Sequence, residues 1–272
     1  MDFSRYLIAT DLDGTFLGPD GHFVARNIEA VARFQAGGGL FTFSTGRVHL
    51  NIYDAVGDPR LLLNAPCVMS NGAYLYDFEK DTPLFEELME PCHVAQLVAF
   101  LQQAFPQVQC RVSTPTDLRV ERTDGYLKRD LTRYDEGCVH VSPMVTWRVD
   151  DWYKIVFRGD AADIGQLREA LVARFGDRFS YTASGSGFLE VQSPTVNKAA
   201  GLDKLRRLYG GDRILIACGD FENDMEMLQA ADIAICPENA MDAVKKISHR
   251  VLCHCKDGLI ADVVEKIEAG EL

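Results

Sequence analysis

The stretch "RYLIATDLDGTFLGPDG", from Arg5 to Gly21, joins a strand-like apolar run to a pair of carboxylates. Asp11 and Asp13 stand two residues apart at the end of the run, and Gly14 and Thr15 follow at once. Bringing carboxylates together at the edge of a core is unfavourable unless a cation or a reaction requires them. The stretch therefore predicts a buried strand that ends in a functional site.

Strand and helix patterns alternate at both ends of the chain. Apolar residues at helical spacing follow the first strand and stop at the glycines Gly37 to Gly39. Short apolar runs then predict further buried strands: "GLFTFSTGR" (39–47), "RLLLNAPCVMSNG" (60–72), "RILIACGD" (213–220) and "DIAIC" (232–236). Helical patterns follow the last two of these strands. Such an alternation is typical of a parallel sheet covered on both faces. We therefore expect a doubly wound, Rossmann-like α/β core.

The middle of the chain has a different pattern. Two amphipathic helices, near residues 94–105 and 163–175, are mixed with alternating runs such as "WYKIVFRG" and "GFLEVQS". This mixture predicts a smaller α+β domain with an open antiparallel sheet. We expect residues 1–82 and 193–272 to form the α/β core, and residues 83–192 to form an inserted α+β domain.

Composition and charge limit the classes of function. The 272 residues carry 28 Lys plus Arg against 40 Asp plus Glu, a net charge of −12, without a basic run. Nucleic acid and membrane partners are therefore not expected. No apolar run approaches the length of a membrane span, and strand-like sequence begins by Arg5 without a leader. These features predict a cytoplasmic protein.

The eight cysteines are expected to remain thiols, since nothing indicates secretion. The tight cluster Cys253-His254-Cys255 lacks a second pair of ligands at zinc spacing. We interpret it as part of a partly buried C-terminal strand.

Known ion and phosphate loops do not explain the first stretch. An EF-hand loop that began at Asp11 would need Gly at its sixth position and Glu at its twelfth, where Phe16 and His22 stand. No G-x-G-x-x-G follows the first strand, and no Walker loop occurs. The sequence therefore does not predict dinucleotide-binding or P-loop chemistry.

Polar residues instead follow several predicted core strands. Asp11 and Asp13 follow the first, Ser44 and Thr45 the second, and Asp220, Asn223 and Asp224 a later one. The carboxyl ends of parallel strands meet at one crevice, and clustered carboxylates there suit Mg²⁺. Lys198 adds an ammonium where the chain re-enters the core. Together these groups predict a pocket for a phosphoryl group, although Thr15 and Ser44 fit simple strand-end hydrogen bonding equally well.

Six motifs in this order resemble the Cof-type phosphatases of the haloacid dehalogenase-like superfamily, which have a type IIB cap. They are "DLDGT" (11–15), "FSTGR" (43–47), "SNGA" (70–73), "NKAAGL" (197–202), "GDFENDMEML" (219–228) and "CKDGLIADVVEKI" (255–267). The resemblance covers the whole core and extends to the size and place of the inserted domain. It implies that residues 1–82 and 193–272 form the catalytic core and that residues 83–192 form a cap for substrate specificity. One departure is "PENA" (237–240), where the family has "GNA", because Pro237 removes a backbone donor.

The resemblance implies a role for each matching residue. Asp11 would be the nucleophile and Asp13 the general acid and base. Thr45 and Lys198 would complete the catalytic set by binding the phosphoryl group and offsetting its charge. The implied substrate-binding residues are Thr45, Gly46, Arg47, Asn71, Lys198 and Asn223. The implied Mg²⁺ ligands are Asp11, Asp13 through its backbone carbonyl, Asp220 and Asp224.

The leading hypothesis is a Mg²⁺-dependent phosphatase of small phosphorylated metabolites, such as sugar phosphates or pyridoxal phosphate, that works as a monomer or small homo-oligomer. Two alternatives stay open at this point. A phosphotransferase of the phosphomannomutase type would pass the phosphoryl group to a sugar instead of water. A catalytically silent sensor would bind a phosphometabolite without releasing phosphate.

Overall fold

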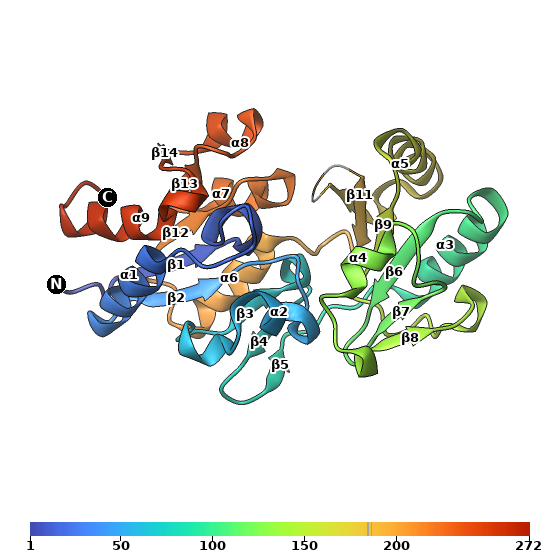
Figure 1. The fold of residues 1–272 in the computed structure, drawn as a ribbon, viewed down its shortest axis with the longest axis horizontal. Helices are drawn as coiled ribbons and strands as arrows, with labels where there is room; N and C mark the ends of the chain where they lie inside the picture. The colour runs from blue at the N-terminus through green and yellow to red at the C-terminus, as the bar shows by residue number, and fades with distance from the viewer. Residues whose placement is uncertain (184, 186) are drawn as a thin grey trace. The chain divides into compact units, whose positions relative to one another are not determined.

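The structure is a computed structural model, and it describes residues 1–183, 185 and 187–272. The chain forms two compact units, one from Met1–Glu86 with Asn197–Leu272 and the other from Glu87–Val196 (Figure 1). The sequence placed the boundaries after residues 82 and 192. They lie later because residues 82–84 pair with the strand at 74–77 of the first unit, while Gln192 donates from its side chain to the Val196 carbonyl.

The first unit is built on a five-stranded parallel sheet in the order β14-β13-β12-β1-β2. Its strands are β1 (Tyr6–Thr10), β2 (Leu40–Phe43), β12 (Ile214–Cys218), β13 (Ile233–Pro237) and β14 (Arg250–Leu252). β1 is buried along its whole length between β12 and β2, as its unbroken apolar run predicts. The expected α/β core is confirmed.

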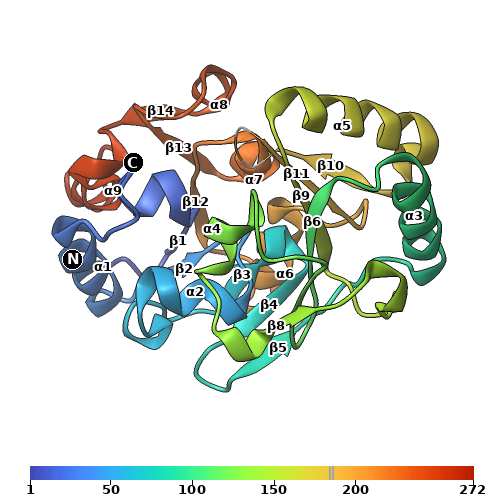
Figure 2. The same ribbon diagram turned by 45° about the vertical axis from the view of Figure 1, so that its right-hand side comes forward.

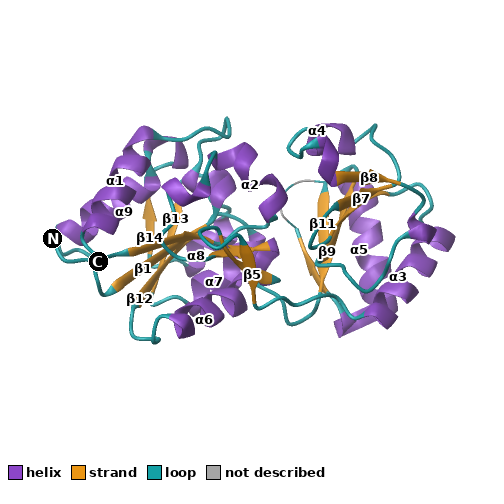
Figure 3. Cartoon of the chain, turned by 90° about the horizontal axis from the view of Figure 1, so that it is seen from below, coloured by secondary structure: helices purple, strands orange, loops and turns teal. Residues whose placement is uncertain are grey.

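Helices cover both faces of this sheet. Figure 3 shows α1 and α9 on one side and α6 and α7 on the other, and each pair packs together. The helices of this unit are α1 (Ala25–Ala36), α2 (His49–Val56), α6 (Lys198–Leu208), α7 (Met225–Ala230), α8 (Asp242–Ile247) and α9 (Leu259–Glu268). One core cluster joins Leu7 of β1, Leu205 of α6 and Leu228 of α7.

Short turns complete this unit at the carboxyl ends of the strands and in the loops. They are η1 (Leu12–Phe16), η2 (Pro59–Leu61), η3 (Ser70–Gly72), η7 (Glu222–Asp224) and η8 (Cys255–Asp257). The interpretation of Cys253 to Cys255 as a strand was wrong, because β14 ends at Leu252 and η8 begins at Cys255.

A small antiparallel sheet, β3-β4-β5, lies beside the parallel one. It consists of β3 (Cys67–Met69), β4 (Tyr74–Asp77) and β5 (Thr82–Leu84). The prediction of a parallel strand across residues 60–72 was therefore largely wrong. Only a bridge between Ser44 and Val68 continues the parallel pairing. Upstream of β3, the Asn64 side chain binds the Phe41 amide and the Gly39 carbonyl, so it occupies the edge of β2 that a strand would need.

The second unit contains a six-stranded sheet in the order β10-β11-β9-β6-β7-β8. Its strands are β6 (Gln109–Ser113), β7 (Leu118–Val120), β8 (Val139–Val141), β9 (Lys154–Arg158), β10 (Ser180–Thr182) and β11 (Phe188–Gln192). The sheet is antiparallel as expected, except that β7 and β8 pair in parallel. The long crossover between these two strands contains a helix, which lets the chain return in the same direction.

Two long helices cover one face of this second sheet (Figure 2). The helices and turns of the unit are α3 (Pro91–Ala104), α4 (Leu127–Leu131), η4 (Glu136–Cys138), η5 (Met144–Thr146), α5 (Ala161–Phe175) and η6 (Gly176–Arg178). Leu97 of α3, Leu167 of α5 and Phe157 of β9 share one core. Along the described chain, no helix is long and apolar enough to cross a membrane.

Candidate active site

The register of the parallel strands brings Asp11 and Asp220 to one edge of the sheet. Thr10, the last residue of β1, lies opposite Cys218 of β12 and Phe43 of β2. The Asp11 amide donates to the Cys218 carbonyl at 2.8 Å, and the Ser44 amide donates to the Thr10 carbonyl at 2.9 Å. Strands that end in register thus place Asp11, Asp220 and the Ser44-Thr45 pair at the same edge.

Lys198 is the first residue of α6, and its side chain is buried. Its ammonium donates to Asp11 Oδ1 at 2.5 Å and to Asp224 Oδ1 at 2.6 Å. The helix start is fixed by Asn197, whose side-chain oxygen accepts the Ala200 amide at 2.8 Å. Although burial lowers it, the charges of Asp11 and Asp224 raise the pKa of Lys198 above its ordinary value. Lys198 is therefore a fixed cation beside the predicted nucleophile.

Three carboxylates form an oxygen cluster around this lysine. One oxygen from each of Asp11, Asp220 and Asp224 lies within 4.8 Å of the others. Burial, strengthened by the charge of Asp224, raises the pKa of Asp220 to about 7. Burial also raises the pKa of Asp11, with Lys198 acting in the opposite direction. One ammonium does not offset this charge, and a set of oxygen donors alone suits a hard divalent cation such as Mg²⁺.

The surroundings of Asp220 and Asp224 hold both side chains in place. The Thr15 hydroxyl donates to Asp220 Oδ1 at 2.6 Å. Asp224 Oδ2 accepts the backbone amides of Asp220 and Phe221 at 2.9 and 3.1 Å. Asp224 therefore ties the loop after β12 to Lys198, and this arrangement leaves less of its carboxylate available to a cation than sequence alone implied.

Asp13 lies on the turn η1 and faces Arg47. The Arg47 guanidinium donates twice to the Asp13 carboxylate, at 2.8 and 2.7 Å. Arg47 is nearly buried, whereas the Asp13 side chain is 48% exposed. The resemblance implied only a substrate-binding role for Arg47, and the sequence did not predict its pair with Asp13. A bidentate pair of this kind fixes the direction of the carboxylate.

The remaining predicted residues lie on two adjoining loops. Thr45 is buried, its hydroxyl accepts the Arg47 amide at 3.1 Å, and Gly46 lies between these two residues. The Asn71 amide donates to the Thr45 carbonyl at 2.9 Å. The Asn223 side chain donates to the Asn71 side-chain oxygen at 3.3 Å. Hydrogen bonds thus link these residues across the two adjoining loops.

Asn71 has an unusual backbone conformation. Asn71 has a φ of +58° and Ser70 a φ of +49°, in a region that residues other than glycine seldom occupy. Such conformations persist only where the surrounding structure holds them, and they occur at binding sites. This agrees with a binding role for Asn71.

Two polar residues near the cluster were missed or left undecided. From the sequence, a functional role for Thr15 and simple strand-end hydrogen bonding were equally good interpretations. Its hydrogen bond to Asp220 places it beside the carboxylates. Asn239 was absent from the predicted set, although the unusual motif "PENA" marked its loop. Its side chain donates to the Gly14 carbonyl at 2.8 Å, inside the turn that follows β1.

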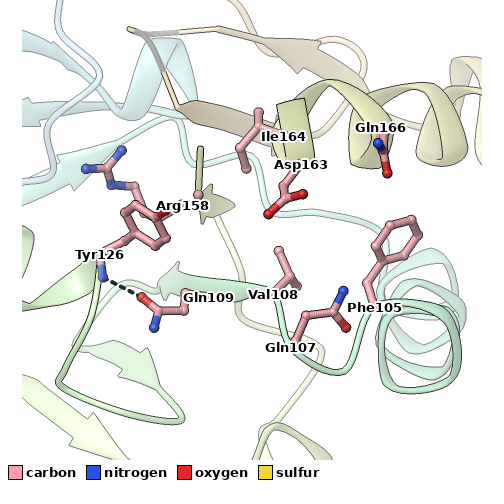
Figure 4. Close-up of a pocket in the computed structure, with 10 residues that line it drawn as sticks. Phe105, Gln107, Val108, Gln109, Tyr126, Arg158, Asp163, Ile164 and Gln166 are labelled. Carbon is pink, nitrogen blue, oxygen red and sulfur yellow. Dashed lines mark hydrogen bonds between the residues drawn. The ribbon is translucent and has the colours of Figure 1, made fainter. Parts of the chain in front are cut away.

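A separate cavity of about 130 Å³ lies inside the unit Glu87–Val196 (Figure 4). Asp163 points into it, and Val108 and Ile164 line it. Arg158 also lines it, but its guanidinium already donates to Asp130 at 2.8 Å and to the Gly187 carbonyl at 2.9 Å. This lining lacks the convergent reactive groups of the carboxylate cluster, which is therefore the candidate active site.

Comparisons with known proteins agree with this site. The sequence model of the family of haloacid dehalogenase-like hydrolases matches residues 8–264. The chain belongs to this family, so its resemblance to the haloacid dehalogenase-like proteins is confirmed.

Curated relatives match along nearly their whole length. The 5-amino-6-(5-phospho-D-ribitylamino)uracil phosphatase YitU of Bacillus subtilis is 26% identical over 253 residues, covering 92% of this chain and 93% of the relative. An HMP-PP phosphatase of Escherichia fergusonii is 28% identical over 265 residues, covering 94% of this chain and 93% of the relative.

A solved structure shows the same fold. The subclass IIB sugar phosphatase BT4131 superposes with a TM-score of 0.83 at 18% identity, covering 98% of this chain and 100% of that one.

Proposed function

We propose that this protein is a Mg²⁺-dependent phosphatase of small phosphorylated metabolites that works through an aspartyl-phosphate on Asp11. The observation that carries the proposal is the buried pairing of Asp11 with Lys198, 2.5 Å apart, inside a cluster of carboxylates. The relatives described above are named as phosphatases, which supports the same reaction here. A sugar phosphate or pyridoxal phosphate is our expected substrate type.

In the first step, an Asp11 carboxylate oxygen attacks phosphorus, and the bond from phosphorus to the leaving oxygen breaks. The Asp13 carboxyl gives its proton to that oxygen, and the alcohol leaves. Lys198 and the Thr45 hydroxyl hold phosphoryl oxygens, so negative charge is offset as it develops. Arg47 holds the Asp13 carboxylate through two hydrogen bonds, one of which would open when Asp13 carries the proton.

In the second step, the Asp13 carboxylate takes a proton from water, whose oxygen attacks phosphorus. The bond between phosphorus and Asp11 breaks, and phosphate leaves with the starting enzyme restored. We expect Asp11, Asp220, Asp224 and the Asp13 carbonyl to hold Mg²⁺. When bound, Mg²⁺ would stabilise negative charge on the phosphoryl oxygens. Asn71, Asn223 and Gly46 would complete the phosphate and substrate contacts. The specificity role of the unit Glu87–Val196 stays a prediction from the resemblance. The cytoplasmic location stays a prediction from the sequence pattern.

The test is phosphate release from a panel of phosphorylated metabolites, with Mg²⁺ or with chelator. We expect metal-dependent release that Asp11→Asn abolishes and that Asp203→Asn leaves unchanged, since Asp203 is paired with Arg207 on the exposed face of α6. Acid quenching with a radiolabelled substrate should leave label on the wild-type chain, which hydroxylamine removes, and none on Asp11→Asn.

Other outcomes would favour the other hypotheses. Label that passes to an added sugar rather than to water would indicate a phosphotransferase. Ligand binding without label and without phosphate release across the panel would indicate a sensor, and either result would contradict the phosphatase.

A further inference from the structure

The turn after β13 reaches two loops of the candidate active site. The turn closes with a hydrogen bond from the Ala240 amide to the Pro237 carbonyl at 3.0 Å, and Asn239 lies at its tip. The Asn239 side chain donates to the Gly14 carbonyl at 2.8 Å and accepts the Cys255 amide at 3.0 Å. A carbonyl only accepts and an amide N–H only donates, so these partners fix which end of the Asn239 side chain faces each of them.

The same segment also holds the loop that carries Asp220. The Met241 amide donates to the Asp220 carbonyl at 3.0 Å. The loop after β13 therefore contacts the backbone on both sides of the carboxylate cluster, at Gly14 and at Asp220.

Gly14 and Asp220 are themselves in close contact. Gly14 has φ of +86°, and a Cβ atom there would lie 2.7 Å from Asp220 Oδ2. Its neighbour Thr15 donates to Asp220 Oδ1 at 2.6 Å. A shift of the Gly14 peptide would therefore move the hydroxyl that orients Asp220, and with it the backbone that carries Asp13.

We infer that Asn239 is a positioning residue that sets the geometry of the cation site through the Gly14 carbonyl. The inference rests on the proposed function for its link to catalysis. Asn239 is exposed, and one exposed hydrogen bond adds little to global stability. Outer contacts that orient metal ligands affect metal affinity or activity by about 10–100-fold. The effect of Asn239 should therefore appear in Mg²⁺ binding and turnover, and not in folding.

Asn239→Ala and Asn239→Asp separate the two contacts. Asn239→Ala removes both. Asn239→Asp keeps an acceptor for the Cys255 amide but loses the donor to the Gly14 carbonyl. Its added negative charge alone would favour a cation, so weaker Mg²⁺ binding in this variant would have to come from altered geometry. Glu238→Gln changes the exposed neighbour in the same turn and is the matched control.

The experiment measures Mg²⁺ binding to the full-length chain by calorimetry, then kcat and KM on the best substrate of the panel. We expect Mg²⁺ affinity to fall about 10-fold in both Asn239 variants. We expect kcat to fall by a similar factor with KM changed less than twofold, while Glu238→Gln matches the wild type. Melting temperatures in chelator should agree within about 4 °C, which shows that folding is preserved.

Several results would overturn the inference. Wild-type Mg²⁺ affinity in both Asn239 variants would do so, as would wild-type affinity in Asn239→Asp alone, since the Gly14 contact would then be dispensable. A wild-type chain that binds no Mg²⁺ would also overturn it. If the wild type binds Mg²⁺ but hydrolyses nothing, the proposed function fails, while the binding comparison still decides the role of Asn239.

Discussion

Lys198 is a buried cation whose two partners are carboxylates of the same site. Removing it leaves Asp11 and Asp224 facing each other without a counter-charge. Loss of one partner from a buried ion pair typically lowers stability by about 3–5 kcal/mol, because the remaining charge stays out of water. The residue proposed to bind the phosphoryl group is therefore also important for the stability of the fold around it.

We predict that Lys198→Ala lowers the free energy of unfolding of its own unit by about 3–5 kcal/mol and abolishes phosphate release. Urea unfolding in chelator measures the first effect. Arg207→Ala on the same helix is the control, since its pair with Asp203 is exposed and contributes at most about 1 kcal/mol. Equal losses in the two variants would show that burial of the Lys198 pair has no special weight.

His49, the first residue of α2, lies in an aromatic pocket. Its ring stacks on Tyr76 with centroids 4.6 Å apart, and its Nδ1 lies 2.9 Å from the Tyr74 hydroxyl. Burial lowers the pKa of His49, while the charges of Asp81 and Glu86 oppose this effect. Folding therefore favours the neutral imidazole.

The sign of the resulting pH dependence follows from linkage. An unfolded histidine takes up its proton near pH 6.5, before the folded one does. The contribution of His49 to stability is thus present above about pH 6.5 and is lost as pH falls through the lower folded-state pKa. We predict that His49→Phe, which keeps a ring against Tyr76, weakens the fall in unfolding free energy between pH 7.5 and 5.5. An unchanged slope would contradict this.

At the scale of elements, α6 packs on β3 and η3 through glycine. A Cβ atom on Gly201 would lie 2.5 Å from a Val68 methyl group and 3.0 Å from the Gly72 Cα. The absence of a side chain lets the helix approach closely, and that approach places Lys198 at the site. The sequence "NKAAGL" thus combines Lys198 with the glycine that lets its helix approach β3.

We predict opposite effects from alanine at two helical glycines. Gly201→Ala should destabilise the chain by about 1–3 kcal/mol, because it overfills the contact of α6 with β3. Gly165→Ala on α5 should stabilise it by about 0.5–1 kcal/mol, since nothing lies within 4 Å of the added methyl group and the unfolded chain loses freedom. Thermal and urea unfolding would check both, and a stabilising Gly201→Ala would disprove the packing argument.

The elements also show what sequence could and could not predict. Apolar runs ending in Asp11, Asp220 and Thr45 predicted both the strands and the polar residues that meet at their ends, because parallel strands share one edge. The pairs Arg47 with Asp13 and Asn239 with Gly14 were not predictable from spacing, since they depend on side-chain directions in loops far apart in sequence. The run at residues 60–63 was mistaken for a strand because apolar content does not show that Leu61 is 81% exposed.

At the scale of the whole molecule, each unit has its own core. Leu167 of α5 belongs to the core of the unit Glu87–Val196, whereas Leu205 of α6 belongs to the core of the other unit. Units with separate cores can unfold in separate steps, so one free energy does not describe the chain. The carboxylate cluster of Asp11, Asp220 and Asp224 lies wholly within the unit formed by the two ends of the chain.

We predict two calorimetric transitions that respond to different changes. Leu167→Ala and Leu205→Ala each remove a fully buried side chain and should cost about 2–5 kcal/mol in their own unit. Leu167→Ala should lower one transition and Leu205→Ala the other. Mg²⁺ should raise only the transition that Leu205→Ala lowers, because a ligand stabilises the unit that binds it. A single transition that both variants lower equally would contradict this independence.

The pairing of β1 with β12 also bears on how the protein is made. β1 is translated first, yet its neighbour on one side is a strand more than 200 residues later, since Tyr6 pairs with Ile214. The segment Glu87–Val196 is continuous and leaves the ribosome before β12 does. On the nascent chain, this inserted unit can fold while β1 still presents an open edge. During this interval β1 lacks one of its two sheet neighbours, and an open strand edge of this kind can pair with other chains.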